Sequence, residues 1–213
     1  MIRFTILVIA FICCLSVDSK EQINLQFNDK YSHSTYGGIG LIQTPTARFS
    51  DDGEFSFGIS AEKPYNRLYA KMQFFPWMEA VLRYTEGTFK AYNPGSHQTW
   101  KDKGLDLKIK LLEESTIRPD IAIGLMDIGG TGVYSSEYLV ASKRFQNIDW
   151  SIGIGWGNLA GVDHIDNIVG WLDENRKIRG GYETFGGTLS LGRLFSGKSN
   201  SIFGGIEYFT PIN

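Results

Sequence analysis

Hydrophobic and polar residues alternate one by one along most of the chain. Between positions 105 and 111, for example, every odd position is aliphatic and every even position carries a charge. A β-strand sends successive side chains to opposite faces, so this segment has one apolar face and one charged face. The pattern recurs with almost no helical periodicity, and it predicts an all-β protein. The candidate strands are 37–43, 53–61, 66–74, 77–86, 104–112, 120–127, 134–144, 148–157, 181–195 and 201–209.

A closed barrel with an apolar outside and a polar inside explains this repetition most simply. The connections agree, because short ones tend to alternate with the long segments 87–103 and 158–180. We therefore predict an antiparallel up-and-down β-barrel of the outer-membrane type, with about ten strands present and the long loops facing the cell exterior. Charged strand residues are costly against lipid, so these are predicted to face the lumen: Lys71, Arg83, Asp106, Lys108 and Lys110.

The first residues have the pattern of a secretory signal peptide. Arg3 precedes an apolar run over 4–15, which is too short to cross a bilayer as a helix. Both cysteines of the chain, Cys13 and Cys14, lie in this run. Cleavage removes them on the favoured interpretation, and lipid attachment at one of them is the alternative. The predicted organisation is a signal peptide at 1–19, a lead-in at 20–35 and a strand region at 36–213.

Composition and motifs argue against several kinds of partner. A formal net charge of -2 supplies no basic field for nucleic acid. Residues 192–199 satisfy the P-loop pattern, but that motif requires a following helix at the phosphates. Here alternation predicts strand 181–195, a hairpin turn at 196–200 and another strand. We therefore predict no nucleotide, cofactor or metal ion and, because no nucleophile–base arrangement is present, no enzymatic activity.

The two long loops mix aromatic and polar residues, as sugar-binding surfaces do, because a ring can stack on a pyranose while polar neighbours bond its hydroxyls. An ordinary solvated loop has the same composition, and both interpretations stay open. The candidate glycan-facing residues are Tyr92, His97, Trp100, Asp163, His164 and Trp171.

A glycine-rich segment at 127–132 resembles a phosphate-cradling loop. Strands flank it on both sides, which favours a tight inter-strand loop whose glycines adopt positive φ. Its candidate residues are Asp127, Gly129, Gly130 and Gly132.

Several separated blocks carry a resemblance to a known family; they are 37–48, 74–79, 101–108, 127–132, 137–143 and 153–157. Together they resemble the YjbH-type proteins, bacterial outer-membrane β-barrels associated with exopolysaccharide and capsule production. The resemblance runs from about residue 36 to the C-terminus. It implies three partners in a Gram-negative envelope: outer-membrane lipid, an extracellular polysaccharide and other products of a polysaccharide operon.

Family members are much longer, so the chain resembles their N-terminal portion, truncated at its C-terminus. Its strands then either close alone or form part of a larger barrel. Two other interpretations remain: a periplasmic or surface carbohydrate-binding β-sandwich, and a truncated, non-functional family fragment.

Overall fold

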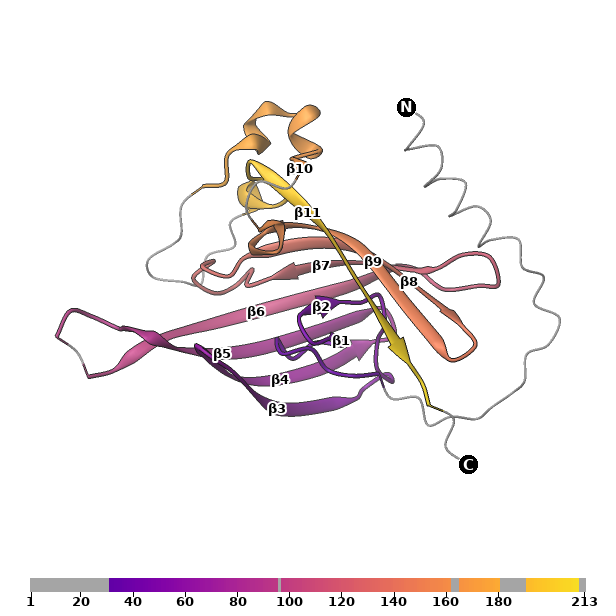
Figure 1. Cartoon of the computed structure of the whole chain (residues 1–213), viewed down its shortest axis with the longest axis horizontal. Coiled ribbons are helices and arrows are strands. Elements are labelled where there is room, and N and C mark those ends of the chain that lie inside the picture. The colour runs from indigo at the N-terminus through magenta and orange to yellow at the C-terminus, as the bar shows by residue number, and fades with distance from the viewer. Residues whose placement is uncertain (1–30, 96, 162–164, 181–190, 211–213) are drawn as a thin grey trace.

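The computed structural model describes residues 31–95, 97–161, 165–180 and 191–210. These residues form an all-β protein, as the alternation predicts (Figure 1). The main strands are β3 (Phe55–Glu62), β4 (Tyr65–Phe75), β5 (Met78–Ala91), β6 (Thr99–Leu112), β7 (Asp120–Met126), β8 (Ser136–Phe145), β9 (Ile148–Gly157), β10 (Ile165–Asp166) and β11 (Ser199–Tyr208). Short 3-10 helices follow β9: η1 (Asn158–Ala160), η2 (Val169–Trp171), η3 (Glu174–Lys177) and η4 (Leu191–Arg193). No helix in the described ranges is long and apolar enough to cross a membrane.

The nine strands form one antiparallel sheet in the order β10-β11-β9-β8-β7-β6-β5-β4-β3. From β3 to β9 each strand pairs with the next one along the chain, which is the up-and-down connectivity expected. The sheet curves strongly, and its two ends are β3 and the two-residue β10, which pairs only with the start of β11. Because β3 pairs with neither β10 nor β11 within the described residues, the sheet is not closed into a barrel.

The two faces of this sheet are inverted relative to those of a water-soluble protein. On the outer, convex face Phe57 and Ile59 are 78% and 77% exposed. On the concave face Lys71 and Gln73 of β4 are fully buried. Successive strand residues alternate between the faces, so the polar half of each strand is the half removed from solvent.

An N-terminal stretch, residues 31–50, covers the concave face, and we call it the inner segment (Figure 1, indigo). It contains a small hairpin of β1 (Gly40–Leu41) and β2 (Thr44–Pro45). The predicted strand 37–43 is therefore wrong in its extent. Ile42, with φ of 45°, turns the chain back after β1, and its carbonyl accepts a hydrogen bond from the amide of Thr35.

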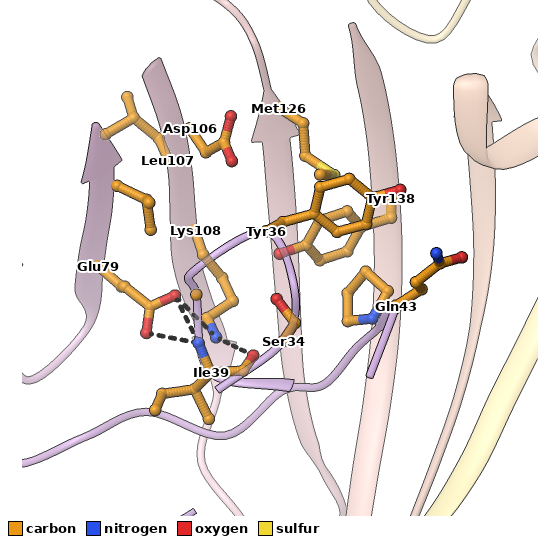
Figure 2. Close-up of a pocket in the computed structure, with 13 residues that line it drawn as sticks. Ser34, Tyr36, Ile39, Gln43, Glu79, Asp106, Leu107, Lys108, Met126 and Tyr138 are labelled. Carbon is orange, nitrogen blue, oxygen red and sulfur yellow. Dashed lines mark hydrogen bonds and ion pairs between the residues drawn. The ribbon is translucent and has the colours of Figure 1, made fainter. Parts of the chain in front are cut away.

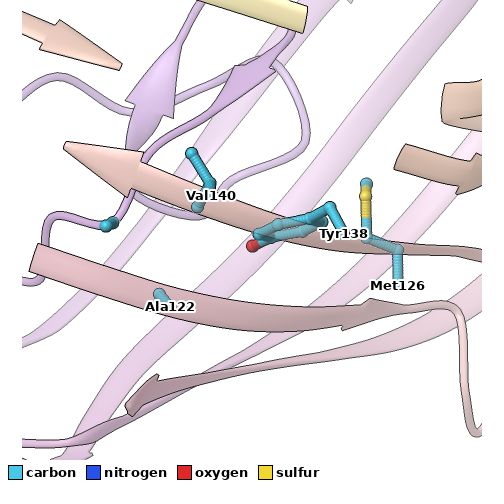
Figure 3. Close-up of a cluster of buried hydrophobic side chains, with 5 residues drawn as sticks. Ala122, Met126, Tyr138 and Val140 are labelled. Carbon is cyan, nitrogen blue, oxygen red and sulfur yellow. The ribbon is translucent and has the colours of Figure 1, made fainter. Parts of the chain in front are cut away.

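A small apolar cluster fixes the inner segment against β7 and β8 (Figure 3). The amide of Ala47 also donates to Ser142 Oγ at 2.8 Å, so this contact has a polar component. Gly124 leaves room for the ring of Tyr138, which a Cβ at that position would overlap. The cluster consists of Ala47, Ala122, Met126, Tyr138 and Val140.

Two other predicted boundaries need correction. The loop predicted at 87–103 shortens to 92–98, because β5 and β6 continue to pair through Gly87 and Trp100. For the strand predicted at 181–195, residues 181–190 lie outside the described residues. The last residues of this predicted strand form η4 instead. The carbonyls of Gly192 and Leu194 accept hydrogen bonds from the side chain of Arg176 and not from the backbone of a neighbouring strand.

The hairpin turn predicted at 196–200 also ends earlier. Ser199 and Asn200 already belong to β11 and pair with β10. The turn is made instead by Phe195 and Gly197, both with positive φ. The chain after Gly192 thus leads into a strand, whereas a P-loop requires a helix at this point.

A β-sandwich needs a second sheet of similar size facing the first. Within the described residues, the concave face is covered only by the inner segment and its two-residue strands.

Candidate functional site

An aromatic cluster lies at one end of the concave face, where β5 meets β6 and β7 meets β8. Tyr65 packs edge-on against both Phe89 and Tyr134, with ring centroids 5.7 Å apart in each case. Trp100 packs edge-on against Tyr134 at 5.5 Å and lies 6.4 Å from Phe89. We call these four residues the aromatic mouth. Phe89 is 59% exposed and the other three rings are half-buried, so ring surface remains available at this end.

The inner segment reaches the aromatic mouth through a stacked arginine. The guanidinium of Arg67 lies 5.0 Å from the ring centre of Tyr65 and 4.8 Å from that of Tyr36. Glu62 pairs with the same guanidinium at 3.2 Å. Such cation–π contacts strengthen when they are shielded from water, and Arg67 is buried. Tyr36, at the tip of the inner segment, is therefore held beneath the mouth.

Asp127 lies directly behind the aromatic mouth, in the loop after β7. Its Oδ2 accepts a hydrogen bond from the amide of Tyr134 at 3.0 Å, whereas its buried Oδ1 has no partner among the described residues. Burial, followed by the nearby carboxylate of Asp102, raises the pKa of Asp127 to about 7. A carboxyl group with this pKa can donate as well as accept a hydrogen bond near neutral pH.

The glycine-rich loop at 127–132 makes room for the side chain of Asp127. A Cβ at Gly130 would overlap both Asp127 Oδ1 and the carbonyl oxygen of Lys103. Of the three glycines, Gly132 adopts the predicted positive φ, at +75°, and Gly129 and Gly130 do not. The predicted tight inter-strand loop is thus what the described residues form, and its glycines allow close packing around a carboxylate.

The opposite end of the concave face is organised by Arg48. Its Nε and Nη2 donate to the two carboxylate oxygens of Asp149, each at 2.8 Å. Its Nη1 donates to Asp120 and to Glu114, each at 2.6 Å. Lys143 adds a second cation to Glu114 at 2.8 Å. This Arg48 cluster fixes the end of the inner segment to β7, β9 and the β6–β7 connection.

The charges between these two ends are also paired. Lys108 Nζ lies 3.1 Å from Glu79 and donates to the carbonyls of Ile39 and Arg48, at 3.1 and 2.7 Å (Figure 2). Lys71 pairs with Glu54 at 3.2 Å and also donates to Ser50. A buried cation requires such partners to offset its desolvation.

The structure places all five residues predicted to face the lumen on the concave side. Arg83 forms a bidentate ion pair with Asp106, in which the Nη2–Oδ1 distance is 3.1 Å. Lys110 lies over the ring of Phe49, 5.1 Å from its centre. With Lys71 and Lys108 these charges pair with one another or with the inner segment. A cavity of about 30 Å³ remains between them, bordered by Tyr36, Glu79 and Tyr138, with room for a water molecule but not for a sugar (Figure 2).

The residues predicted to face a glycan do not form one surface. Trp100 belongs to the aromatic mouth, while Tyr92 and His97 are exposed at the tip of the β5–β6 hairpin. Trp171, 70% exposed, lies in the segment between β10 and β11, which stands apart from that tip in Figure 1. Asp163 and His164 lie outside the described residues.

Three mouth residues were not identified from the sequence: Tyr65, Phe89 and Tyr134. Each lies at the end of a strand or in a connection, where aromatic residues are common and give no specific signal. The pairing of β4, β5 and β6 brings Tyr65 and Phe89 together with Trp100, and the connection between β7 and β8 adds Tyr134.

These features define a class: an open antiparallel sheet with an apolar outer face, whose polar concave face is filled by the protein's own N-terminal segment. The comparisons with known proteins are more specific. The family model described as "Exopolysaccharide biosynthesis protein YbjH" matches residues 32–213, and the chain belongs to this YjbH family. The resemblance seen in the sequence blocks is thereby confirmed.

A relative with a curated name supports the assignment. Over 184 residues the chain is 40% identical to the protein named "Uncharacterized lipoprotein YjbH" of Escherichia coli (strain K12). The match covers 84% of this chain and 26% of the relative, so the chain spans about a quarter of that protein's length. No solved structure matches the chain.

Proposed function

We propose that this chain forms part of the wall and the inner plug of an outer-membrane β-barrel that assists the production or export of an exopolysaccharide without catalysing a reaction. The observation that carries the proposal is the inverted sheet. Large apolar side chains cover its exposed outer face, whereas its lysines and arginines are buried on the concave side. In water such an exposed apolar face favours aggregation, whereas a strand wall in a bilayer requires an apolar face toward the lipid.

Strand length supports the same proposal. A membrane-spanning strand needs about 9–11 residues, and β4, β5, β6, β8 and β9 are all at least 10 residues long. The open edge of β3, and that of β11 beyond its short pairing with β10, would leave backbone groups unpaired in lipid. Further strands, from a longer chain or from another copy, therefore complete the wall in this proposal.

The aromatic mouth is the proposed contact with the polysaccharide. Its rings offer stacking surface at the end of the concave face, and Asp127 lies behind them with an oxygen that lacks a partner in the described part of the chain. Most connections at this end are longer than those at the other end, so by the usual arrangement of such barrels it faces the cell exterior. Other products of the same operon remain proposed partners.

The name of the relative bears on the N-terminus. That protein is described as a lipoprotein. This favours the alternative interpretation for the present chain, in which Cys13 or Cys14 carries a lipid and anchors the protein in the cell envelope. Labelling with radioactive palmitate tests it, because Cys13→Ser and Cys14→Ser together should abolish the label.

Membrane fractionation tests the barrel itself. The chain should stay in the outer-membrane fraction through a carbonate wash and should leave it only in detergent. Because a lipid anchor alone could also resist carbonate, the double cysteine variant is the control and should behave like the natural chain. Release of that variant by carbonate would contradict a wall that spans the membrane.

Binding of the exopolysaccharide tests the aromatic mouth. Trp100→Ala should weaken the affinity of the detergent-solubilised protein for the isolated polymer about five- to tenfold, because one stacking contact is worth about 1 kcal/mol. Phe57→Ala is the control, since it removes an exposed ring from the outer face, away from the mouth. Equal loss in both variants, or no loss at Trp100, would argue against this contact.

A further inference from the structure

The segment that follows β9 folds back over the outer face of the sheet. Glu137 of β8 and Trp156 of β9 are paired neighbours on that face, since they alternate with the concave residues Tyr138 and Gly155. Their side chains are 1% and 4% exposed, although Ile152 on the same face is 46% exposed. Residues 165–180 and 193–198 cover them, and we call these residues the outer collar (Figure 1, orange and yellow).

Polar contacts with two side chains fix the collar in place. Arg179 donates to both carboxylate oxygens of Glu137, at 2.7 and 2.8 Å, and the amide of Phe195 donates to the same carboxylate at 2.9 Å. Asn167 accepts from the indole N–H of Trp156 at 2.9 Å. The collar is therefore attached to the outer wall through its polar groups.

Asn167 also organises the collar internally. Its amide nitrogen donates to the carbonyls of Arg176, Phe195 and Gly197, at 3.0, 3.2 and 2.9 Å. Because this amide is 2% exposed, these contacts are made away from water, where an unpaired polar group would be costly. The collar is thus a defined structure and not an arbitrary loop conformation.

The collar also carries apolar side chains that face away from these contacts. Trp171, Leu172 and Ile178 are 70%, 90% and 78% exposed, and we call them the collar patch. Charged residues beside them pair with each other: Glu174 with Lys177 at 2.9 Å, and Asp173 with Arg176 at 3.6 Å. The apolar groups are thus presented without a competing net charge.

We propose that the collar patch inserts into the lipid interface beside the barrel wall and acts as an anchor at the level where the strands end. This inference rests on the proposed membrane location. On β8 the outward residues between Glu137 and Lys143 are apolar, and this stretch measures about 20 Å along the strand. A tilted strand of that length falls short of an apolar band of about 25 Å.

The outer collar continues the apolar outer surface of the wall past Glu137, where the apolar stretch of β8 ends. It covers the carboxylate of Glu137 on the outer face, and the exposed Trp171, Leu172 and Ile178 belong to the same segment. Tryptophan is the residue that membrane proteins concentrate at this interface, because its ring is apolar while its N–H can reach water. Lipid is therefore the occupant that the continuity of the outer face indicates.

Nitroxide labels at single cysteines test the proposal in the full chain, with Cys13 and Cys14 replaced by serine. The labelled variants are Leu172→Cys in the collar patch, Leu82→Cys on the outer face of β5 and Tyr92→Cys at the β5–β6 tip. In lipid vesicles, collisions with oxygen report lipid and collisions with a water-soluble nickel complex report water. The ratio of the two at Leu172 should be several times that at Tyr92 and lower than that at Leu82.

Each other outcome has a distinct meaning. A lipid signal at Leu82 with an aqueous signal at Leu172 overturns the anchor and leaves the proposed membrane wall standing. An aqueous signal at Leu82 overturns the membrane wall itself. A label at Leu172 that neither reagent reaches also overturns the anchor, because the patch is then covered by protein, such as a second copy of the chain.

Discussion

The two ends of the concave face differ in how their charges are satisfied. At one end Arg48 bonds to Asp149, Asp120 and Glu114, and the contacts are short and buried. At the other end Asp127 keeps a buried oxygen without a partner among the described residues, beside rings that are still partly exposed. The same face therefore holds the inner segment at one end and leaves binding capacity at the other.

The largest expected effect follows from breaking the Arg48 cluster. Arg48→Ala leaves three carboxylates near one another without their shared cation, and a broken buried ion pair costs about 3–5 kcal/mol. The free energy of unfolding, measured by urea titration of the reconstituted protein, should fall by about this amount. Proteolysis within residues 31–50 should also become faster, because the inner segment loses its attachment.

Arg118→Ala is the control for this variant. Arg118 is an exposed cation in the connection between β6 and β7, where it bonds only to Ser115 among the contacts described. Its removal should change the stability by less than about 0.5 kcal/mol. Equal losses in the two variants would mean that the Arg48 cluster does not hold the inner segment.

A smaller effect is expected from the loop behind the aromatic mouth. Gly130→Ala places a methyl group against Asp127 Oδ1 and the carbonyl oxygen of Lys103, so the loop must shift, at a cost of about 1–3 kcal/mol. Gly192→Ala is the matched control, since nothing lies within 4 Å of a Cβ there. Urea titration should separate the two variants, and equal stability would show that the loop yields without strain.

The strand pattern could be predicted from the sequence because alternation depends only on neighbouring residues. Lys71, Lys108 and their neighbours were assigned to the correct side of their strands by this rule alone. Contacts between distant segments were not predictable in this way. Nothing in the local sequence indicates that Arg48 meets Asp149, or that Arg179 covers Glu137.

The aromatic mouth illustrates the same limit. Trp100 was identified because it lies among polar residues, but its partners Tyr65, Phe89 and Tyr134 come from three other parts of the chain. Their meeting depends on the register of β4, β5 and β6, which pairs Tyr65 with Gly87 and Gly87 with Trp100. A register is set by the whole sheet and not by any single strand.

The last expected effect on stability depends on pH and concerns Asp127, whose Oδ1 has no partner among the described residues. The pKa of Asp127 is about 7 in the folded protein and about 4 in an unfolded chain. Between these values the folded state binds more protons than the unfolded state, so the free energy of unfolding falls as the pH rises from about 4 to about 7. Above pH 7 the charged carboxylate is buried at full cost, and the curve levels off.

Asp127→Asn removes this titration while keeping an oxygen for the amide of Tyr134 and a residue type that tolerates the positive φ at this position. The variant should match the natural protein near pH 4 and exceed its stability at pH 8, which urea titrations at the two pH values measure. Asp51→Asn, at an exposed site, should leave the pH dependence unchanged. If Asp127→Asn instead lowers stability equally at both pH values, the carboxylate is satisfied in the folded protein, and the mouth does not differ from the Arg48 end in the way argued above.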